Sequence, residues 1–245
     1  MATLSVIIPT VNEEVYLEAA LRSVRFADEI IVVDSYSTDE TAEIALKYAN
    51  QFLQRKFDNF SNQKNYALEH ATSEWILFLD ADERITYPLQ IEIKKAIESE
   101  KHGGYKLQFP HFFMNRFLYH HSNKVLRVVK REGAQYSGLV HEKLHCEGSI
   151  GLLKNPVLHF TYKGLDHYIQ KRERYAWFQA EQLQKKGKKA NLFLLFFKPT
   201  YRFFSSYILK GGFKDGIPGL TVGAINAYGV FSRYVKLMLL NRGMR

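Results

Sequence analysis

Two aspartates, Asp80 and Asp82, directly follow an apolar run at 75–79 and are separated by one alanine. Side chains two residues apart in an extended or turning chain can point to the same side, so the two carboxylates can act together. Carboxylate oxygens suit a divalent cation that keeps some waters and takes its other ligands from a substrate phosphate. The alternative interpretation is an acidic turn that merely ends a strand. The surrounding elements decide between the two.

The elements before these aspartates alternate between strand and helix patterns. A continuous apolar run such as 75–79 is typical of a strand that helices cover on both faces. An alternation of strands and helices with short loops predicts an α/β fold with a doubly wound, mainly parallel sheet. The predicted strands are 4–8, 29–33 and 51–55, and the predicted helices are 12–25, with Asn12 as N-cap, 40–49 and 61–71.

The loops that follow these strands are predicted to meet. Right-handed crossovers place the loops after parallel strands at one edge of the sheet, where such sheets bind ligands. We therefore expect residues 10–14, 34–39 and 80–83 to line one crevice. The sequence has no glycine-rich dinucleotide fingerprint after the first strand and no P-loop motif. A phosphate bound in the crevice would thus be neutralised by a metal.

The second half of the chain has a different composition. A helix is expected at 89–98, shorter strands at 105–109, 125–129, 143–147 and 157–162, and a long helix at 165–184. Residues 190–245 are basic and rich in aromatic side chains, and their apolar stretches fall short of the roughly 20 residues that span a bilayer. We predict a catalytic domain at 1–189 and a helical C-terminal appendage at 190–245 that lies in the membrane interface. The alternative is a helical hairpin packed on the main domain.

Charge is distributed unevenly along the chain. Residues 1–100 carry 9 Lys and Arg against 18 Asp and Glu, whereas residues 101–245 carry 25 against 7. Such asymmetry predicts that the second half meets an anionic partner, such as lipid headgroups, nucleic acid or a phosphorylated acceptor. The single cysteine, Cys146, excludes an internal disulfide and suits a reducing compartment. The N-terminal residues do not resemble a signal peptide.

Three motifs, in this order and spacing, carry a resemblance to a known family. Residues 5–14, 34–41 and 79–83 together resemble a family 2 glycosyltransferase of the GT-A fold. Residues 63–65, 140–142, 158–162 and 212–216 are similar to the branch of bacterial lipopolysaccharide-core β-1,4-glucosyltransferases. The resemblance therefore covers nearly the whole chain.

The resemblance implies an activity and its partners. It implies an inverting, metal-dependent enzyme that uses Mg2+ or Mn2+ and moves glucose from UDP-glucose to a glycolipid acceptor, the lipopolysaccharide core. The basic second half, the interfacial pattern of the C-terminal residues and the lack of a signal peptide predict a cytoplasmic protein held peripherally by an anionic membrane surface on the inner face of the cell membrane, with no nucleic acid as partner. The alternatives are a sugar-phosphate nucleotidyltransferase, and a non-catalytic membrane- or nucleic-acid-binding protein.

The implied chemistry assigns roles to individual residues. Asp82 would contact the metal, Asp80 would bind the donor ribose or a metal-bound water, and His159 would complete the metal ligands. Glu142 would be the base that takes the proton from the acceptor hydroxyl, with His141 as its rival. Alternatively, His159 is a core histidine and Glu142 a solvated loop carboxylate. The expected donor-binding residues are Pro9, Thr10, Asn12, Glu14, Asp34, Asp80 and Lys64, the last of which could also be a solvated surface lysine.

Overall fold

The computed structural model describes residues 2–138, 142–160 and 164–244. The chain divides into two compact units. The first comprises Met1–Phe109 and Asn123–Phe160, and the second comprises Pro110–Ser122 and Thr161–Arg245. The second unit thus takes in the expected appendage together with residues that precede it.

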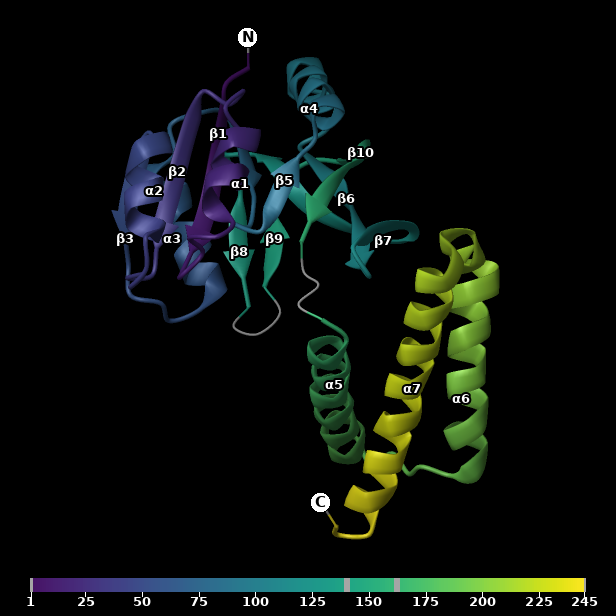
Figure 1. The fold of residues 1–245 in the computed structure, drawn as a ribbon. Coiled ribbons are helices and arrows are strands. Elements are labelled where there is room, and N and C mark those ends of the chain that lie inside the picture. Colours follow the sequence, from purple (N-terminus) through teal and green to yellow (C-terminus); the bar gives the residue numbers. More distant parts are fainter. Residues whose placement is uncertain (1, 139–141, 161–163, 245) are drawn as a thin grey trace. The chain divides into compact units, whose positions relative to one another are not determined.

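The first unit is built on a mixed, mainly parallel sheet (Figure 1). In the described residues the strand order is β3-β2-β1-β4-β7-β6-β10-β5. β1 pairs in parallel with β2 and β4, β2 with β3, and β6 with β10, whereas β4 with β7 and β10 with β5 are antiparallel. The predicted mainly parallel sheet is confirmed. Its strands are β1 Leu4–Thr10, β2 Glu29–Asp34, β3 Gln51–Gln54, β4 Trp75–Phe78, β5 Glu83–Ile85, β6 Gly104–Phe113, β7 Arg116–Lys130 and β10 Ile150–His159.

Helices cover both faces of this sheet, and successive residues of its central strands serve the two faces in turn. Ile8 and Leu77 pack in one cluster with residues of α1, α2 and α4. Ile7 and Phe78 pack in a second cluster with α3 and with Tyr136 of a small separate ribbon. Burial on both faces explains the unbroken apolar runs. These elements are α1 Leu17–Ser23, α2 Thr41–Tyr48, α3 Phe60–His70, α4 Tyr87–Ser99, and the ribbon of β8 Gln135–Ser137 and β9 Lys143–His145.

Two sequence-based expectations about these elements are wrong. The first helix begins at Leu17, and Asn12 is not its N-cap, because its backbone lies in the left-handed region and its side-chain oxygen accepts a hydrogen bond from Thr38 N. β6 and β7 are much longer than the strands expected at 105–109 and 125–129. Their outer residues are polar or aromatic without clean alternation, so the pattern gave no signal there.

The second unit consists mainly of helices: α5 Leu165–Lys185, α6 Leu192–Phe204, the π-helical turn Ser205–Leu209, the 3-10 turn Gly212–Asp215, and α7 Gly216–Asn241. The tip of the β6–β7 hairpin belongs to it, because Phe113 and Leu118 pack with Tyr168 of α5 and Val222 of α7. His121 of the same tip contacts Asp215 through Nδ1 at 2.9 Å. No helix within the described residues is long and apolar enough to cross a membrane.

Candidate active site

The loops after β1 and β2 are tied to each other. Asn12 N donates to Ser37 Oγ at 2.9 Å, and Thr38 N donates to Asn12 Oδ1 at 2.9 Å. Asn12 and Tyr36 both adopt positive φ, at 52° and 60°. A tyrosine in this region is uncommon and is held there by its surroundings, as is frequent at ligand sites. The first two of the three predicted loops therefore converge.

Glu14 and Asp34 act within these same loops. Glu14 Oε2 accepts a hydrogen bond from Glu40 N at 3.1 Å. Asp34 is fully buried and accepts hydrogen bonds from Ser37 N at 3.0 Å and from Gln54 Nε2 at 3.2 Å. Neither residue lines the pocket described next, and neither does Asn12. Their contacts hold the loop backbones in place.

A pocket of about 250 Å³ opens where the three loops meet. Pro9 and Thr10 line it together with Ser35, Asp80 and Asp82, so the predicted convergence is confirmed. Thr10 Oγ1 is buried and has no hydrogen-bond partner among the described residues. An unpaired buried hydroxyl is costly unless a ligand or water satisfies it. The pocket thus offers a polar atom to a bound molecule. Its remaining lining residues are Val11, Glu13, Phe57, Phe60, Gln63 and Ala81.

A buried arginine holds the loop that carries the two aspartates. Arg127 of β7 reaches Asp80 Oδ2 at 2.7 Å and Glu83 Oε1 at 2.8 Å through Nη2, and its side chain is 10% exposed. Glu83 Oε2 in turn accepts a hydrogen bond from Asp80 N at 2.9 Å. The guanidinium also lies 5.3 Å from the Phe109 ring centroid. Arg127 was not among the residues predicted for the site, and Glu83 was expected there only as part of the loop 80–83, without a role of its own.

The charges in this cluster shift the pKa values of its members. Burial would raise the pKa of Asp80, but the Arg127 and Lys64 charges outweigh it and hold that pKa well below its usual range. Burial dominates for Glu83 and raises its pKa to about 7, although Arg127 opposes the shift. The two carboxylates raise the pKa of Arg127 further, despite its burial. Asp80 therefore stays ionised and partnered by Arg127.

His159 lies beside Asp82, as the sequence analysis predicted. It ends β10, where the antiparallel pairing with β5 sets it opposite Glu83. His159 Nε2 lies 3.1 Å from Asp82 Oδ2, and its Nδ1 lies 3.8 Å from Glu83 Oε1. Burial would lower the pKa of His159, but the hydrogen bond with Asp82 and the nearby carboxylates raise it. The pair thus combines two groups that commonly bind metals.

The fit of a metal ion to these residues rests on the pair Asp82 and His159. Among the described residues, no cluster of three His, Cys, Asp or Glu side chains is arranged to hold a metal. Asp80 Oδ2 already accepts a hydrogen bond from Arg127 Nη2 at 2.7 Å, so Asp80 is a poorer candidate for direct metal contact. A catalytic Mg2+ or Mn2+ needs few protein ligands, because waters and substrate phosphates supply the rest. An imidazole nitrogen and a carboxylate oxygen 3.1 Å apart therefore suit such an ion.

Lys64 is buried, and the interpretation of it as a solvated lysine is wrong. It is 5% exposed, and its Nζ lies 4.9 Å from the Tyr136 ring centroid and 3.4 Å from Glu142 Oε1. Its charge also lowers the pKa of Asp80, which indicates that the two groups are near each other. Glu142, whose side chain is 27% exposed, is thereby linked to the site. His141 lies outside the described residues.

Comparisons with known proteins agree with this geometry. The profile of the family described as Glycosyl transferase family 2 matches residues 5–161. The lipopolysaccharide core biosynthesis glycosyltransferase LpsC of Rhizobium meliloti is 29% identical over 92% of this chain and 89% of its own length. A glycosyltransferase of Rickettsia conorii is also 29% identical, over 96% of this chain and 89% of the relative.

Solved structures share the fold. The mannosyltransferase PcManGT from Pyrobaculum calidifontis, in complex with GDP-Man and Mn2+, has a TM-score of 0.57 at 15% identity, covering 97% of this chain and 87% of that one. Residues 1-349 of TarS from S. aureus, in complex with UDP-GlcNAc, have a TM-score of 0.51 at 14% identity, covering 99% and 92%. The expected GT-A-type α/β fold is therefore confirmed.

The first prediction concerns Arg127. Arg127→Met leaves two buried carboxylates without their cation, and breaking a buried ion pair in this way costs about 3–5 kcal/mol. Urea unfolding of the variant should show a loss of that size. Lys130→Met is the matched control, because Lys130 on the same strand pairs with Glu100 at the surface and should contribute below about 1 kcal/mol. Equal losses in the two variants would contradict the structural role of Arg127.

The second prediction concerns pH and His159. Because the folded pKa of His159 is raised, its contribution to stability is full below the unfolded pKa of about 6.5 and disappears as pH rises through the folded value. In the presence of chelator, His159→Gln should lower the free energy of unfolding by about 1 kcal/mol at pH 6 and by little at pH 9.

Combining this change with Asp82→Asn tests the source of the effect. Asp82 accepts the hydrogen bond that raises the pKa of His159, so the pH-dependent part should shrink in the Asp82→Asn background. If His159→Gln lowered the free energy of unfolding equally at both pH values, with Asp82 or in the Asp82→Asn background, then Asp82 would not be what favours the charged form of the histidine.

Proposed function

Because the chain belongs to glycosyl transferase family 2, we propose that it moves glucose from UDP-glucose to a glycolipid acceptor, the lipopolysaccharide core. One observation carries the proposal. The loops after β1, β2 and β4 line one pocket, to which they contribute Thr10, Ser35, Asp80 and Asp82. Membership of the family favours glycosyl transfer over nucleotidyl transfer and over a non-catalytic binding role.

The donor in this proposal is a nucleoside-diphosphate sugar in the pocket of Pro9 and Thr10. PcManGT holds GDP-Man and TarS holds UDP-GlcNAc on similar folds, which supports a nucleotide sugar as the ligand class. The unpaired hydroxyl of Thr10 would gain a hydrogen-bond partner there. Asn12, Glu14 and Asp34 would serve donor binding by holding the two loops in shape.

The leaving diphosphate requires positive charge. Asp82 and His159 would hold Mg2+ or Mn2+, which when bound stabilises negative charge on the departing diphosphate. The Mn2+ in PcManGT supports a divalent cation. Asp80, oriented by Arg127, would bind the donor ribose or a metal-bound water. Lys64 would add a second cation close to the same phosphates.

We propose that Glu142 acts as the base in a single inverting displacement. The acceptor hydroxyl oxygen forms a bond to the anomeric carbon as the bond from that carbon to the diphosphate oxygen breaks, and Glu142 takes the hydroxyl proton. Lys64 Nζ lies 3.4 Å from Glu142 Oε1, and the Lys64 charge also acts on Asp80, which lines the pocket. His141 is the alternative base.

The acceptor and the place of reaction follow from the second half of the chain. LpsC is a lipopolysaccharide core biosynthesis glycosyltransferase that matches 92% of this chain, which supports a glycolipid acceptor. α6 exposes a series of aromatic and aliphatic side chains, a composition typical of interfacial helices. We propose that the enzyme works as a peripheral protein on the cytoplasmic face of the membrane.

The third prediction tests the proposed function at Asp82. Asp82→Asn should lower glucosyl transfer at least about 100-fold, because metal stabilisation of developing charge contributes several kcal/mol to the rate. The free energy of unfolding should fall by no more than about 1 kcal/mol near pH 6, where the hydrogen bond with His159 is lost, and should change little at pH 9. Transfer to a lipopolysaccharide-core acceptor is measured with UDP-glucose, with chelator, and with added Mn2+.

The matched control for Asp82 is Glu74→Gln, an exposed carboxylate at the opposite end of β4. It should transfer sugar normally and lose activity in chelator as the wild type does. Full turnover by Asp82→Asn at low metal concentration would overturn the metal assignment. No transfer from any nucleotide sugar by the wild type would overturn the proposed function.

The fourth prediction separates base from ligand at Glu142. Glu142→Gln keeps the shape of the side chain and removes its basicity, so kcat should fall by about 10²–10⁴ while KM for the donor hardly changes. A collapse of donor affinity with kcat preserved would make Glu142 a donor ligand, and the base would then be His141.

A further inference from the structure

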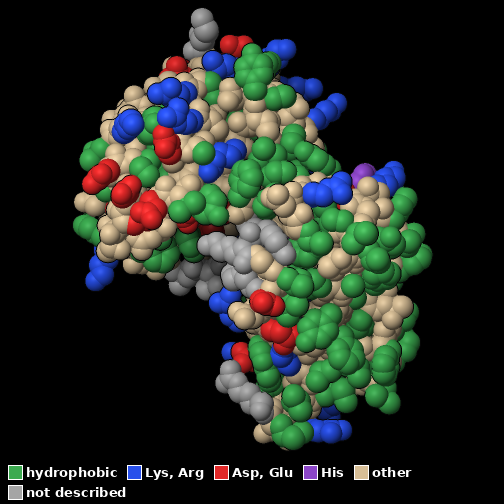
Figure 2. Space-filling view, viewed as in Figure 1, with side chains coloured by type: hydrophobic (Ala, Val, Ile, Leu, Met, Phe, Trp, Pro, Cys, Tyr) green, Lys and Arg blue, Asp and Glu red, His purple; other side chains and the backbone are tan. Residues whose placement is uncertain are grey.

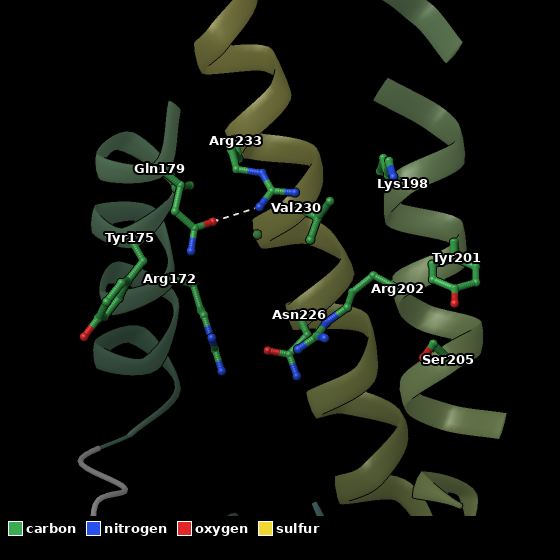
Figure 3. A pocket seen from close by; sticks show the side chains of 12 residues that line it. Arg172, Tyr175, Gln179, Lys198, Tyr201, Arg202, Ser205, Asn226, Val230 and Arg233 are labelled. Carbon is green, nitrogen blue, oxygen red and sulfur yellow. Dashed lines mark hydrogen bonds between the residues drawn. The ribbon is translucent and has the colours of Figure 1, made fainter. Parts of the chain in front are cut away.

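The helical unit contains a pocket that the catalytic assignment leaves unused. It has a volume of about 380 Å³ and lies among α5, α6 and α7 (Figure 3). No Asp or Glu is among its lining residues in the described chain, although basic residues come from all three helices. The side chains or backbone that line it belong to Arg172, Tyr175, Ala176, Gln179, Lys198, Tyr201, Arg202, Ser205, Asn226, Gly229, Val230 and Arg233.

Four cations gather in this pocket. Arg172 extends from α5 and Arg202 from α6 toward the space beside Asn226 of α7 (Figure 3), and Lys198 and Arg233 complete the set. The hydrogen bonds that Arg172 and Arg233 make here are to neutral groups, the Tyr168 hydroxyl at 2.9 Å and Gln179 Oε1 at 3.0 Å. Like charges held together repel one another, so an anion bound among them is stabilised.

A buried donor points to the same conclusion. Arg233 Nε is buried without a hydrogen-bond partner among the described residues. An unsatisfied buried polar group is costly, so a ligand or water is expected to meet it. Arginine forks, an amide and a hydroxyl such as Ser205 form the donor set that suits phosphate oxygens. The pocket is therefore built for an oxyanion.

An apolar surface adjoins the pocket. α6 exposes Phe193 and Phe197, whose rings stack with centroids 4.9 Å apart, and Phe197 stacks in turn on Tyr201, which lines the pocket. Figure 2 shows hydrophobic side chains gathered over much of the helical unit. A ligand that combines a phosphate with hydrocarbon matches both features, because apolar helix faces bury in the acyl boundary of a membrane.

We propose that this pocket, the α5–α7 pocket, binds the phosphate group of a membrane lipid headgroup. The phosphate lies among Arg172, Arg202 and Arg233, and the aromatic face of α6 enters the lipid surface beside it. The inference deepens the membrane part of the proposed function and rests on it, while the identity of the transferred sugar has no bearing on it. The inference predicts that the protein prefers phosphate-bearing lipids to other anionic lipids. Charge alone would attract the protein to any anionic surface equally.

The fifth prediction measures that selectivity with the full chain. Binding is compared on phosphatidylcholine vesicles that contain phosphatidic acid and on vesicles that contain oleate at the same surface charge. Wild type should prefer phosphatidic acid by about tenfold or more, since its phosphate accepts charge-assisted hydrogen bonds from several arginines at once whereas a carboxylate accepts fewer. Arg172→Gln with Arg202→Gln should reduce this preference to near unity.

The matched control is Lys186→Gln with Lys188→Gln, which removes the same charge from exposed positions of the helical unit. It should weaken binding to both kinds of vesicle and keep the preference, because surface lysines attract anionic lipid without regard to its chemistry. Asn226→Leu, which leaves the net charge unchanged, should also lower the preference. If the double arginine variant has a lowered melting temperature, the preference of the Asn226→Leu variant is the measurement that decides the test.

The outcomes separate the possible sources of phosphate. Equal binding of the wild type to the two anionic vesicles overturns the inference and leaves diffuse electrostatics. Binding of glycerol phosphate without selectivity between vesicles overturns the lipid assignment and makes the pocket a site for soluble phosphate. Selective vesicle binding by a protein that hydrolyses no nucleotide sugar would overturn the proposed function while the lipid site stands.

Discussion

The buried charge of Arg127 is the constraint on which the candidate active site depends. A guanidinium that is 10% exposed has to be paired, and the nearest carboxylates belong to Asp80 and Glu83. β7, which carries it, runs antiparallel to β4, so the register Leu77 to Val128 brings Arg127 level with the end of β4. The loop with the two aspartates is thereby fixed by a residue more than forty positions further along the chain.

The same interaction gives the two aspartates different partners. Asp80 is ionised and held by Arg127, whereas Asp82 faces His159, with which it shares a hydrogen bond. Two carboxylates of one motif are thus placed in different environments, which is how proteins give identical groups different roles. Our assignment of the metal to Asp82 rests on this difference, because Asp80 already has a permanent cation beside it.

The sequence allowed the first half of the α/β fold to be predicted, because its strands are buried on both faces and their side chains are mainly apolar. Ile7 and Ile8 illustrate this, since they pack on opposite faces of the sheet. The long strands β6 and β7 gave no such pattern. The residues near their shared turn, such as Phe113 and Leu118, pack against helices that come much later in the sequence. The left-handed Asn12 was also beyond prediction, because a turn and an N-cap favour the same residue type.

Pro9, Thr10, Asp80 and Asp82, which line the pocket, could be named from the sequence, but not the contacts that tune them. Lys64 is buried by Tyr136, a residue more than seventy positions away, and its helical pattern alone does not distinguish it from a surface lysine. Arg127 did leave a signal, as a single charge inside the apolar run at 125–129. A charge in such a run requires a buried partner, and the acidic loop after β4 was the group that needed one.

The uneven distribution of charge acquires a structural explanation in the helical unit. α6 buries little of its apolar surface, with Leu195 as its buried residue, although its neighbours α5 and α7 pack closely through Ala180 and Leu237. Exposing an apolar helix face to water is unfavourable, and so is holding four cations close together. Contact with hydrocarbon would relieve the first cost, and a bound phosphate would relieve the second. In the proposed function, the acidic first half would hold the cation that meets a diphosphate donor, and the basic second half would contact the anionic surface that presents the acceptor.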